Sequence, residues 1–255
     1  MSQELEWSRA GIISQARMGS TRLPGKVLLT ARGISMLQYH VERLRASGLP
    51  VCIATTTLPE DDSIEAHAEK LGVVCYRGSS EDVLSRYYEA ATLCGLQTVV
   101  RVTSDCPLVD GNLVGEAVRR YVAANNPAAY VSNGLQRSFP RGLDFEVFSY
   151  QLLAEAQLNA TSASDREHVT PYLHQNRSGR VVISQVVQER DASTYRITLD
   201  TAEDFQLLKI LFEQHHANLL SAEQLTDLLA QHPELVALNA AIEQKKYDFT
   251  KTAAS

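Results

Sequence analysis

The sequence has no excess of basic residues, no paired cysteines and no long hydrophobic run. Its 255 residues carry 24 Lys and Arg against 30 Asp and Glu, a net charge of -6. This balance argues against a general nucleic-acid binder, because such proteins need a basic surface to neutralise phosphates. No uncharged stretch approaches the length of a membrane span, and the start, MSQELEWSRAG, lacks the apolar core of a signal peptide. We therefore expect a cytoplasmic protein with no nucleic-acid or membrane partner.

The cysteines do not form a recognisable metal or disulfide pattern. Cys52, Cys75, Cys94 and Cys106 lie far apart, without a C-x-x-C pair or a matching histidine spacing. This spacing argues against a zinc site and a disulfide framework and favours buried free thiols. Internal repeats and low-complexity segments are absent as well, and the 44% hydrophobic composition is that of an ordinary globular protein.

The two common glycine-rich phosphate motifs, G-x-x-x-x-G-K-[ST] and G-x-G-x-x-G, are also missing. Instead the stretch ARMGSTRLPGK, residues 16–26, places Arg17, Arg22 and Lys26 in a frame of glycine, serine, threonine and proline. Pro24-Gly25 suits a tight turn whose glycine takes a positive φ. Guanidinium groups match phosphate oxygens, so the loop predicts binding of a small anion such as a triphosphate. The alternative is a solvated basic loop paired with surface acids.

Strand and helix patterns alternate through the first half of the chain. Strands are predicted at 11–15, 51–55, 73–76, 98–102 and 129–132, and helices at 34–44, 62–71, 81–94 and from Asp110 onward. The second of these helices is expected to be capped by Asp61 or Asp62. Such alternation indicates βαβ units, a mostly parallel sheet and an α/β, Rossmann-like fold.

The second half has a less regular pattern. It predicts a loop and an alternating strand over 134–147, helices at 149–159 and 165–176, strands at 181–187 and 195–199, and helices from 202 to about 243. The simplest organisation is an N-terminal extension (1–10), one domain (11–250) with an inserted arm at about 134–195, and a frayed tail (251–255).

Two aspartates follow predicted strands. Asp105 comes shortly after the strand at 98–102, and Asp200 directly follows the strand at 195–199. Carboxyl ends of parallel strands share one sheet edge, so the turns 16–26, 103–107 and 200–204 are expected to meet there. Carboxylates near a triphosphate suit Mg²⁺, although a turn or helix cap is the alternative for an isolated aspartate. Asp204 is interpreted as a first-turn acid of the next helix, and Asp110 as a cap.

These residues lie within a longer resemblance. QARMGSTRLPGKVLL resembles the signature of the cytidylyltransferases that make CMP-sugars, most closely the spore-coat polysaccharide biosynthesis family, with CMP-ketodeoxyoctulosonate and CMP-sialate synthetases more distant. The similarity continues, in order, through ATTTLPEDDSI, YRGSSEDVLSRYYEAA, RVTSDCPLVD, RGLDFEVFS, REHVTPY and RITLDTAEDF. It covers about residues 11 to 210.

The resemblance implies transfer of CMP from CTP to an anionic sugar acceptor, with release of pyrophosphate. It makes Asp105 and Asp200 the Mg²⁺ ligands, although Thr201 and Ala202 supply no second acid where the sialate synthetases have one. Catalysis is assigned to Arg17, Lys26, Asp105 and Asp200, and nucleotide binding to Ala16, Arg17, Gly19, Ser20, Arg22, Lys26, Arg77, Ser79 and Asp105. Acceptor binding is assigned to Arg141, Glu146, Arg166 and His168, although Arg141 and Glu146 could instead face a second subunit, and a lone helical histidine such as His168 is more often structural.

The resemblance also implies a homodimer. Two other activities stay open: a glycosyltransferase that consumes a nucleotide-sugar, and a cytidylyltransferase acting on a sugar or polyol phosphate. The first is disfavoured because the middle of the chain lacks a D-x-D metal motif. Ser79 is nearly as well explained by capping of a helix as by contact with the base.

Overall fold

The computed structural model describes residue 7 and residues 9–243. The predicted tail at 251–255, and all of the predicted extension 1–10 except residues 7, 9 and 10, lie outside the described residues. The strands are β1 (Ala10–Gln15), β2 (Thr30–Ala31), β3 (Ile34–Ser35), β4 (Val51–Thr56), β5 (Val74–Gly78), β6 (Thr98–Thr103), β7 (Ala129–Ser132), β8 (Glu146–Ser149) and β9 (Val182–Gln185). The helices are α2 (Met36–Arg45), α3 (Asp62–Leu71), α4 (Val83–Leu93), α5 (Gly111–Ala124), α6 (Tyr150–Asn159), α7 (Ala163–His168), α8 (Pro171–His174), α9 (Ala202–His215), α10 (Ala222–Gln231) and α11 (Pro233–Ala237), with short 3-10 turns at Lys26–Leu28, Pro59–Asp61 and Ala217–Leu219.

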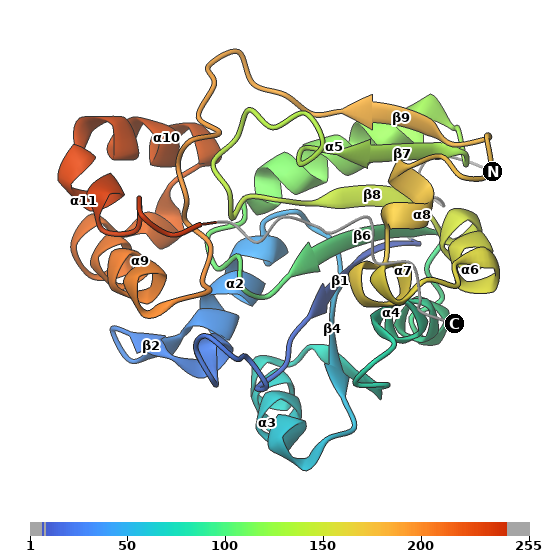
Figure 1. Ribbon diagram of the computed structural model, residues 1–255, viewed down its shortest axis with the longest axis horizontal. Helices are drawn as coiled ribbons and strands as arrows, with labels where there is room; N and C mark the ends of the chain where they lie inside the picture. The colour runs from blue at the N-terminus through green and yellow to red at the C-terminus, as the bar shows by residue number, and fades with distance from the viewer. Residues whose placement is uncertain (1–6, 8, 244–255) are drawn as a thin grey trace.

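A seven-stranded sheet in the order β5-β4-β1-β6-β8-β7-β9 forms the centre of the molecule (Figure 1). Strands β5, β4, β1 and β6 are parallel, as predicted, whereas β8 runs antiparallel to both β6 and β7. The chain proceeds from β1 outward to β4 and β5 and then returns to the other side of β1 with β6. This reversal lies between β1 and β6, where open α/β sheets bind their ligands.

Both faces of the sheet are covered by helices. One apolar cluster joins α2, α3 and α5 to side chains such as Ile12, Ile53 and Val100, and a second joins α4, α6 and α8 to Ile13, Ala54 and Val99. Neighbouring residues of one strand therefore enter opposite clusters, as the alternation of a β-strand requires. Because β1 and β4 are buried on both faces, their apolar residues are consecutive, at Ile12-Ile13 and at 51–54, rather than alternating.

A third apolar cluster lies beyond the end of the sheet. It gathers α9, α10 and α11 around Leu108, Ile197 and Leu199, and its stacked rings Tyr39 and Phe212 have centroids 3.9 Å apart. Figure 1 shows these C-terminal helices together at one end of the molecule. They hold the segment 195–201 against the ends of the central strands.

The predicted strands of the first half all occur, each within two residues of its expected bounds. The expected helix 34–44 begins later, at Met36, because Ile34 belongs to β3 and Ser35 caps the helix by accepting from the Gln38 N–H. Asp110 caps α5, accepting from two backbone N–H groups as predicted.

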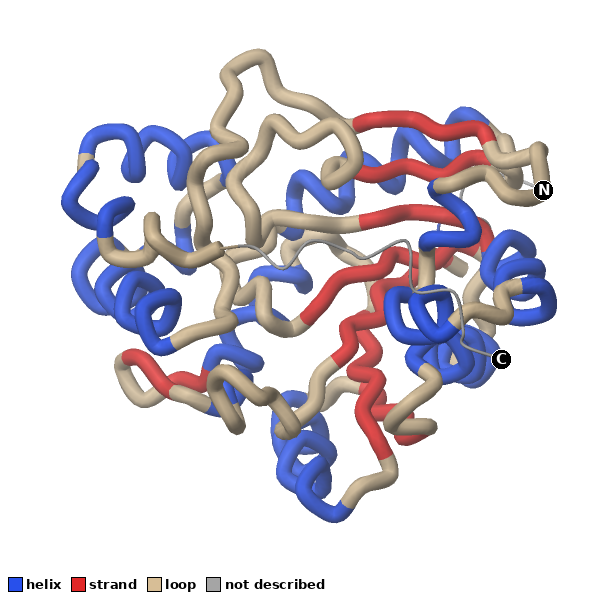
Figure 2. Tube along the Cα trace, in the orientation of Figure 1, coloured by secondary structure: helices blue, strands red, loops and turns tan. Residues whose placement is uncertain are grey.

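The second half differs more from the prediction. The strand expected at 195–199 does not form: the chain there makes one isolated bridge, between Arg141 and Arg196. The helix expected at 165–176 is two short helices, α7 and α8, interrupted at Val169 (Figure 2). The segment 134–195, predicted as an inserted arm, contributes β8 and β9 to the central sheet. No helix among residues 7 and 9–243 is long and apolar enough to cross a membrane.

Candidate active site

The basic loop 16–26 after β1 folds back on itself. The Met18 carbonyl oxygen accepts from the backbone N–H groups of Ser20, at 2.9 Å, and Gly25, at 3.0 Å. Gly25 has a φ of 66°, which the predicted Pro24-Gly25 turn requires and which other residues adopt at a cost. The loop therefore has a defined shape before any ligand arrives.

A buried aspartate fixes the loop to the next strand. Asp61 accepts from the Met18 N–H at 2.7 Å and from the hydroxyl of Thr56 at the end of β4. Asp61 or Asp62 was predicted to cap α3; Asp61 occupies the N-cap position, but its carboxylate makes no capping bond to that helix. Its oxygens are instead used to hold the basic loop.

Lys26 bonds two aspartates, Asp105 and Asp200, that lie far from it in the sequence. Its Nζ lies 3.0 Å from Asp105 Oδ2 and 2.8 Å from Asp200 Oδ1. Burial alone would lower the pKa of Lys26, but the two carboxylates outweigh it and raise the pKa above its usual value. The predicted meeting of the turns after β1, after β6 and before α9 is thus confirmed in the structure.

Asp200 is contacted by three cations. Besides Lys26, its Oδ2 lies 3.2 Å from Arg22 Nη2 and 3.0 Å from Arg196 Nη2. Burial acts to raise the pKa of Asp200, but Lys26 and Arg22 outweigh it, and the pKa is lowered. The carboxylate is therefore ionised and held in one place.

Asp204 orients this aspartate from the first turn of α9. It forms a capping box with Thr201, as a first-turn acid can, and it also accepts from Arg196 Nη2 at 2.7 Å and from the Asp200 N–H at 3.0 Å. Asp204 is fully buried. Asp204, predicted only as a first-turn acid of α9, therefore also sets the position of Asp200.

Asp105 is held by its own turn and by the segment before Asp200. Thr103 Oγ1 donates to Asp105 Oδ1 at 2.5 Å. The Asp105 carbonyl accepts from the Leu199 N–H at 2.7 Å and from Thr198 Oγ1 at 3.0 Å. Although 195–199 forms no strand, these bonds keep it beside the end of β6.

A buried histidine, His40, is bonded to the turn that carries Asp105. His40 contacts Ser14 Oγ through Nε2 at 2.7 Å and the Cys106 carbonyl through Nδ1 at 2.9 Å. Ser14 Oγ also lies 2.8 Å from Ser104 Oγ. Burial lowers the pKa of His40 to about 4, so the ring is neutral near pH 7.

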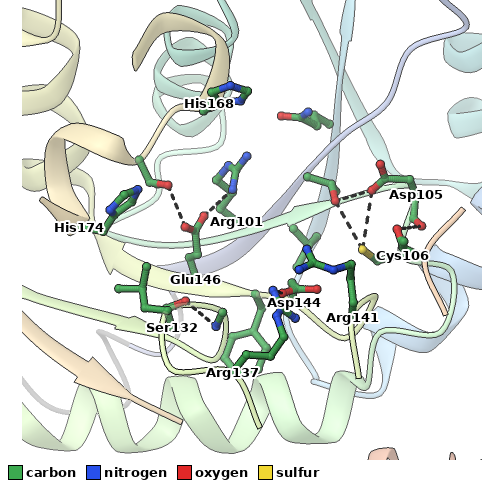
Figure 3. A pocket seen from close by; sticks show the side chains of 18 of the residues that line it. Arg101, Asp105, Cys106, Ser132, Arg137, Arg141, Asp144, Glu146, His168 and His174 are labelled. Carbon is green, nitrogen blue, oxygen red and sulfur yellow. Dashed lines mark hydrogen bonds and ion pairs between the residues drawn. The ribbon is translucent and has the colours of Figure 1, made fainter. Parts of the chain in front are cut away.

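A cleft of about 320 Å³ opens beside this cluster, and Asp105 and Asp200 line it. Its floor is formed by β6, β7 and β8, one wall by the loop 134–145, and the other by residues 167–174. Figure 3 shows Arg101 and Glu146 between the wall that carries His168 and the wall that carries Arg137 and Arg141. Three of the four predicted acceptor residues, Arg141, Glu146 and His168, line this cleft.

Arg101 and Glu146 are cross-strand partners on the floor of the cleft. They lie opposite each other in the β6–β8 pairing, and Arg101 Nη1 is 2.6 Å from Glu146 Oε2. Glu146 Oε1 accepts from the Tyr130 hydroxyl and, at 2.8 Å, from Thr170 Oγ1. Burial would raise the pKa of Glu146, but Arg101 and these donors outweigh it and lower the pKa.

Arg101, Arg137 and His174 are cleft residues that the sequence analysis did not assign. Arg137 forms an ion pair with Asp144 on the loop wall. His174 packs obliquely against the ring of Tyr130, and burial lowers its pKa, as it does that of His168. The sequence does contain a sign that Arg101 has a specific partner, because a charged residue within the apolar strand TVVRV needs a buried counter-charge.

The structure gives Arg166, predicted to bind the acceptor, partners outside the cleft. Its Nε lies 3.0 Å from both carboxylate oxygens of Asp82, and its Nη2 bonds Gln157 Oε1 at 2.9 Å. These contacts tie α7 to the start of α4, and Arg166 is not among the residues that line the cleft. Arg166 also stands near the end of α7 rather than at the start of a longer helix.

Arg77 and Ser79 likewise have structural partners. Arg77 forms ion pairs with Asp62 and Glu65 of α3, at 2.7 and 2.8 Å. Ser79 Oγ accepts from the N–H groups of Glu81 and Asp82 in the turn before α4, whereas the N-cap of α4 is Asp82 rather than Ser79. Neither residue lines the cleft.

The remaining loop residues differ in exposure. Arg17 and Gly19 are exposed and Ser20 is partly exposed, whereas Ala16 is buried, with its N–H bonded to the carbonyl of Ala54 at 3.1 Å. Arg17 forms no ion pair with any residue that the structure describes. Its guanidinium is therefore accessible to an anion from solvent.

The two aspartates fit a metal ion that protein and substrate hold together. Among residues 7 and 9–243, no cluster of three or more His, Cys, Asp or Glu forms a metal cage. Asp105 and Asp200 nevertheless reach one common nitrogen, so they lie close enough to share a cation. Mg²⁺ is usually bound by one or two carboxylates with phosphate oxygens and waters, which this pair can accommodate.

Comparison with known proteins places the chain in a family. A family model described as cytidylyltransferase matches residues 10–248. The spore coat polysaccharide biosynthesis protein SpsF of Bacillus subtilis is 33% identical, over 87% of this chain and 94% of its own.

Solved structures show the same fold. A cytidylyltransferase from Leptospira borgpetersenii is 34% identical and superposes with a TM-score of 0.86, over 92% of this chain and 99% of its own. A CMP:2-keto-3-deoxy-manno-octonic acid synthetase complexed with CTP superposes with a TM-score of 0.59 at 17% identity, over 81% of this chain and 99% of its own, a likeness of fold alone. The chain therefore belongs to the cytidylyltransferase family and is a CTP-dependent nucleotidyltransferase.

Proposed function

We propose that this cytidylyltransferase transfers CMP from CTP to a sugar acid of the ulosonic or nonulosonic type, with release of pyrophosphate, for surface polysaccharide biosynthesis. The observation that carries the proposal is the bonding of Lys26 to both Asp105 and Asp200 at the mouth of an arginine-lined cleft. A cationic loop and two carboxylates at one point are what a triphosphate and its metal ion require.

The basic loop would hold the leaving group. Arg17, Arg22 and Lys26 can bind the β- and γ-phosphate oxygens and neutralise the charge that accumulates on departing pyrophosphate. Lys26 is suited to this because its flexible stem lets the ammonium turn from the carboxylates to a phosphate. Gly19 offers its backbone N–H at the same loop and Ser20 its hydroxyl, because the Ser20 N–H is already bonded to the Met18 carbonyl.

Cytidylyltransferases generally use a divalent metal ion, and for this chain we propose Mg²⁺ held by Asp105 and Asp200. When bound, the ion would polarise the α-phosphate and offset negative charge there. Asp204 and Arg196 would keep Asp200 in place, and Thr103 would do so for Asp105. These contacts hold the carboxylates so that little reorganisation is needed.

The cleft suits an acceptor with a carboxylate and several hydroxyls. Arg141 and Arg137 on the loop wall can bind the carboxylate, whereas Glu146, His168 and His174 offer hydrogen bonds to hydroxyl groups. SpsF is named for spore coat polysaccharide biosynthesis, which supports a role in surface glycans.

The test is acceptor-dependent pyrophosphate release from CTP and Mg²⁺ across ulosonic acids, nonulosonic acids, sugar phosphates and polyol phosphates. Release with a sugar acid supports the proposal. Release only with a phosphorylated sugar or polyol would establish the alternative acceptor class. Transfer from a nucleotide-sugar without pyrophosphate release would indicate a glycosyltransferase.

Two properties of the whole molecule belong to the same proposal. We expect a homodimer, which light scattering would measure directly. We also expect a cytoplasmic location, which fractionation of cells would test.

A further inference from the structure

The wall of the cleft contains a strained turn. Val169 has a φ of 72° and a ψ of −53°, and the Thr170 N–H donates to the His168 carbonyl at 2.8 Å. These values define a three-residue γ-turn in its strained form, with positive φ at the central residue. A β-branched residue is poorly suited to that conformation.

The turn changes the direction of two flanking side chains. In a continuous helix, residues two apart point to nearly opposite sides, so His168 and Thr170 could not both face one cleft. With the turn between them, both line it, and Thr170 Oγ1 donates to Glu146 Oε1 at 2.8 Å. The interruption of the helix at Val169 therefore creates this part of the cleft wall.

The Val169 side chain keeps the turn in place. It is fully buried in the apolar cluster that joins α4, α6 and α8 to the sheet. Pro171 follows directly after Thr170 and has no N–H with which to continue α7. Burial of the isopropyl group thus offsets the strain of its backbone, and such offset strain tends to occur at functional sites.

We propose that Val169 is a positioning residue for the acceptor: its strained turn aims His168 and Thr170 at the hydroxyl groups of the sugar. The proposal rests on the proposed function of the cleft as the acceptor site. The chemistry suits hydroxyls rather than a second anion, because Thr170 and a neutral imidazole donate and accept hydrogen bonds without charge. Burial lowers the pKa of His168, in agreement with a neutral ring.

Val169→Ala and Val169→Gly separate the turn from the packing. Both remove buried methyl groups, and glycine removes more. Only glycine adopts a positive φ without strain, so Val169→Gly keeps the turn, whereas Val169→Ala lacks the buried isopropyl group and relaxes to a negative φ. We expect Val169→Ala to raise the acceptor KM by about tenfold or more, a loss typical of small misplacements, and Val169→Gly to stay within about threefold of wild type.

Thr170→Val serves as a second variant, since it keeps the shape and removes the hydroxyl. We expect it to raise the acceptor KM while the KM for CTP stays unchanged. CTP affinity measured by calorimetry shows that each variant is folded and that the nucleotide site is intact.

Four outcomes are distinguishable. An acceptor KM that rises in Val169→Ala and Thr170→Val but not in Val169→Gly supports the positioning role. A KM that rises most in Val169→Gly would show that packing matters rather than the turn, and equal KM values in all variants would remove the role altogether. A wild-type protein that binds CTP but uses no sugar acceptor would overturn the proposed function, and the role of Val169 with it.

Discussion

Lys26 Nζ lies 2.8 Å from Asp200 Oδ1, although 174 residues separate them in the chain. The contact joins the loop after β1 to the segment before α9, and Asp105 after β6 is bonded to the same nitrogen. Strands β1 and β6 are parallel neighbours, so the residues that follow them share one sheet edge. The C-terminal helices then bring Asp200 to that edge.

Lys26→Met tests the role of the shared ammonium. The variant leaves two partly buried carboxylates without their common cation and removes a proposed phosphate ligand, so we expect kcat/KM for CTP to fall by about 10² or more. Lys70→Met, which removes an exposed lysine of α3, is the matched control and is expected to keep full activity. Equal kcat/KM values in the two variants would contradict the assignment of Lys26.

Asp105→Asn and Asp200→Asn test the proposed metal site. Each removes one hard oxygen ligand with its charge, so we expect Mn²⁺ to bind the CTP complex at least about tenfold more weakly, as measured by electron paramagnetic resonance. Asp227→Asn, at an exposed ion pair, is the control. Unchanged Mn²⁺ affinity in both site variants would place the ion elsewhere.

Arg166→Ala tests whether Arg166 binds the acceptor or only joins α7 to α4 and α6. Because Arg166 bonds Asp82 and Gln157 away from the cleft, we expect the variant to lose stability, by about 1–2 kcal/mol, while the acceptor KM stays the same. Arg190→Ala removes an exposed pair and should cost less than about 0.5 kcal/mol. Thermal unfolding and acceptor kinetics check this, and a raised acceptor KM at unchanged stability would restore the original prediction.

His40 makes stability depend on pH. Its pKa is about 4 in the folded protein and near 6.5 when unfolded, so between these values the unfolded chain binds a proton that the folded protein excludes. Stability is therefore fully present above about pH 6.5 and declines as the pH falls toward 4, by up to about 3 kcal/mol.

The measurement is the urea unfolding free energy at several pH values for wild type and His40→Gln. Glutamine has no charge to gain and can still bond Ser14 and the Cys106 carbonyl. Its unfolding free energy should fall less steeply with acidification than that of wild type. Parallel pH profiles for the two proteins would show that His40 is not the cause.

The meeting of loop 16–26 with Asp105 and Asp200 was largely predictable. Loop 16–26, Asp105 and Asp200 each follow a segment with a readable pattern, and the geometry of a parallel sheet brings such turns together. The strand expected at 195–199 was wrong, yet Asp200 is in place because Asp105 binds the backbone there and Asp204 orients the carboxylate. Hydrogen bonds between loops have no periodicity that a sequence reveals.

The cleft was less predictable, for a different reason. Arg101 and Glu146 face each other only because β8 lies beside β6 in antiparallel register, and strand order is not contained in the hydrophobic pattern. Arg166 and His168 are two residues apart in one motif at the end of α7. Arg166 nevertheless bonds Asp82, whereas His168 lines the cleft. The unusual φ of Val169 could not be foreseen either, since valine rarely adopts it.

Calorimetric titration of CTP in the presence of Mg²⁺ tests the central claim most directly, with wild type compared against the double variant Asp105→Asn/Asp200→Asn and against Lys26→Met. If the loop and the two carboxylates surround one triphosphate, wild type binds CTP in a Mg²⁺-dependent manner and both variants lose at least about tenfold in affinity. CTP binding of equal strength in all three proteins would contradict the account.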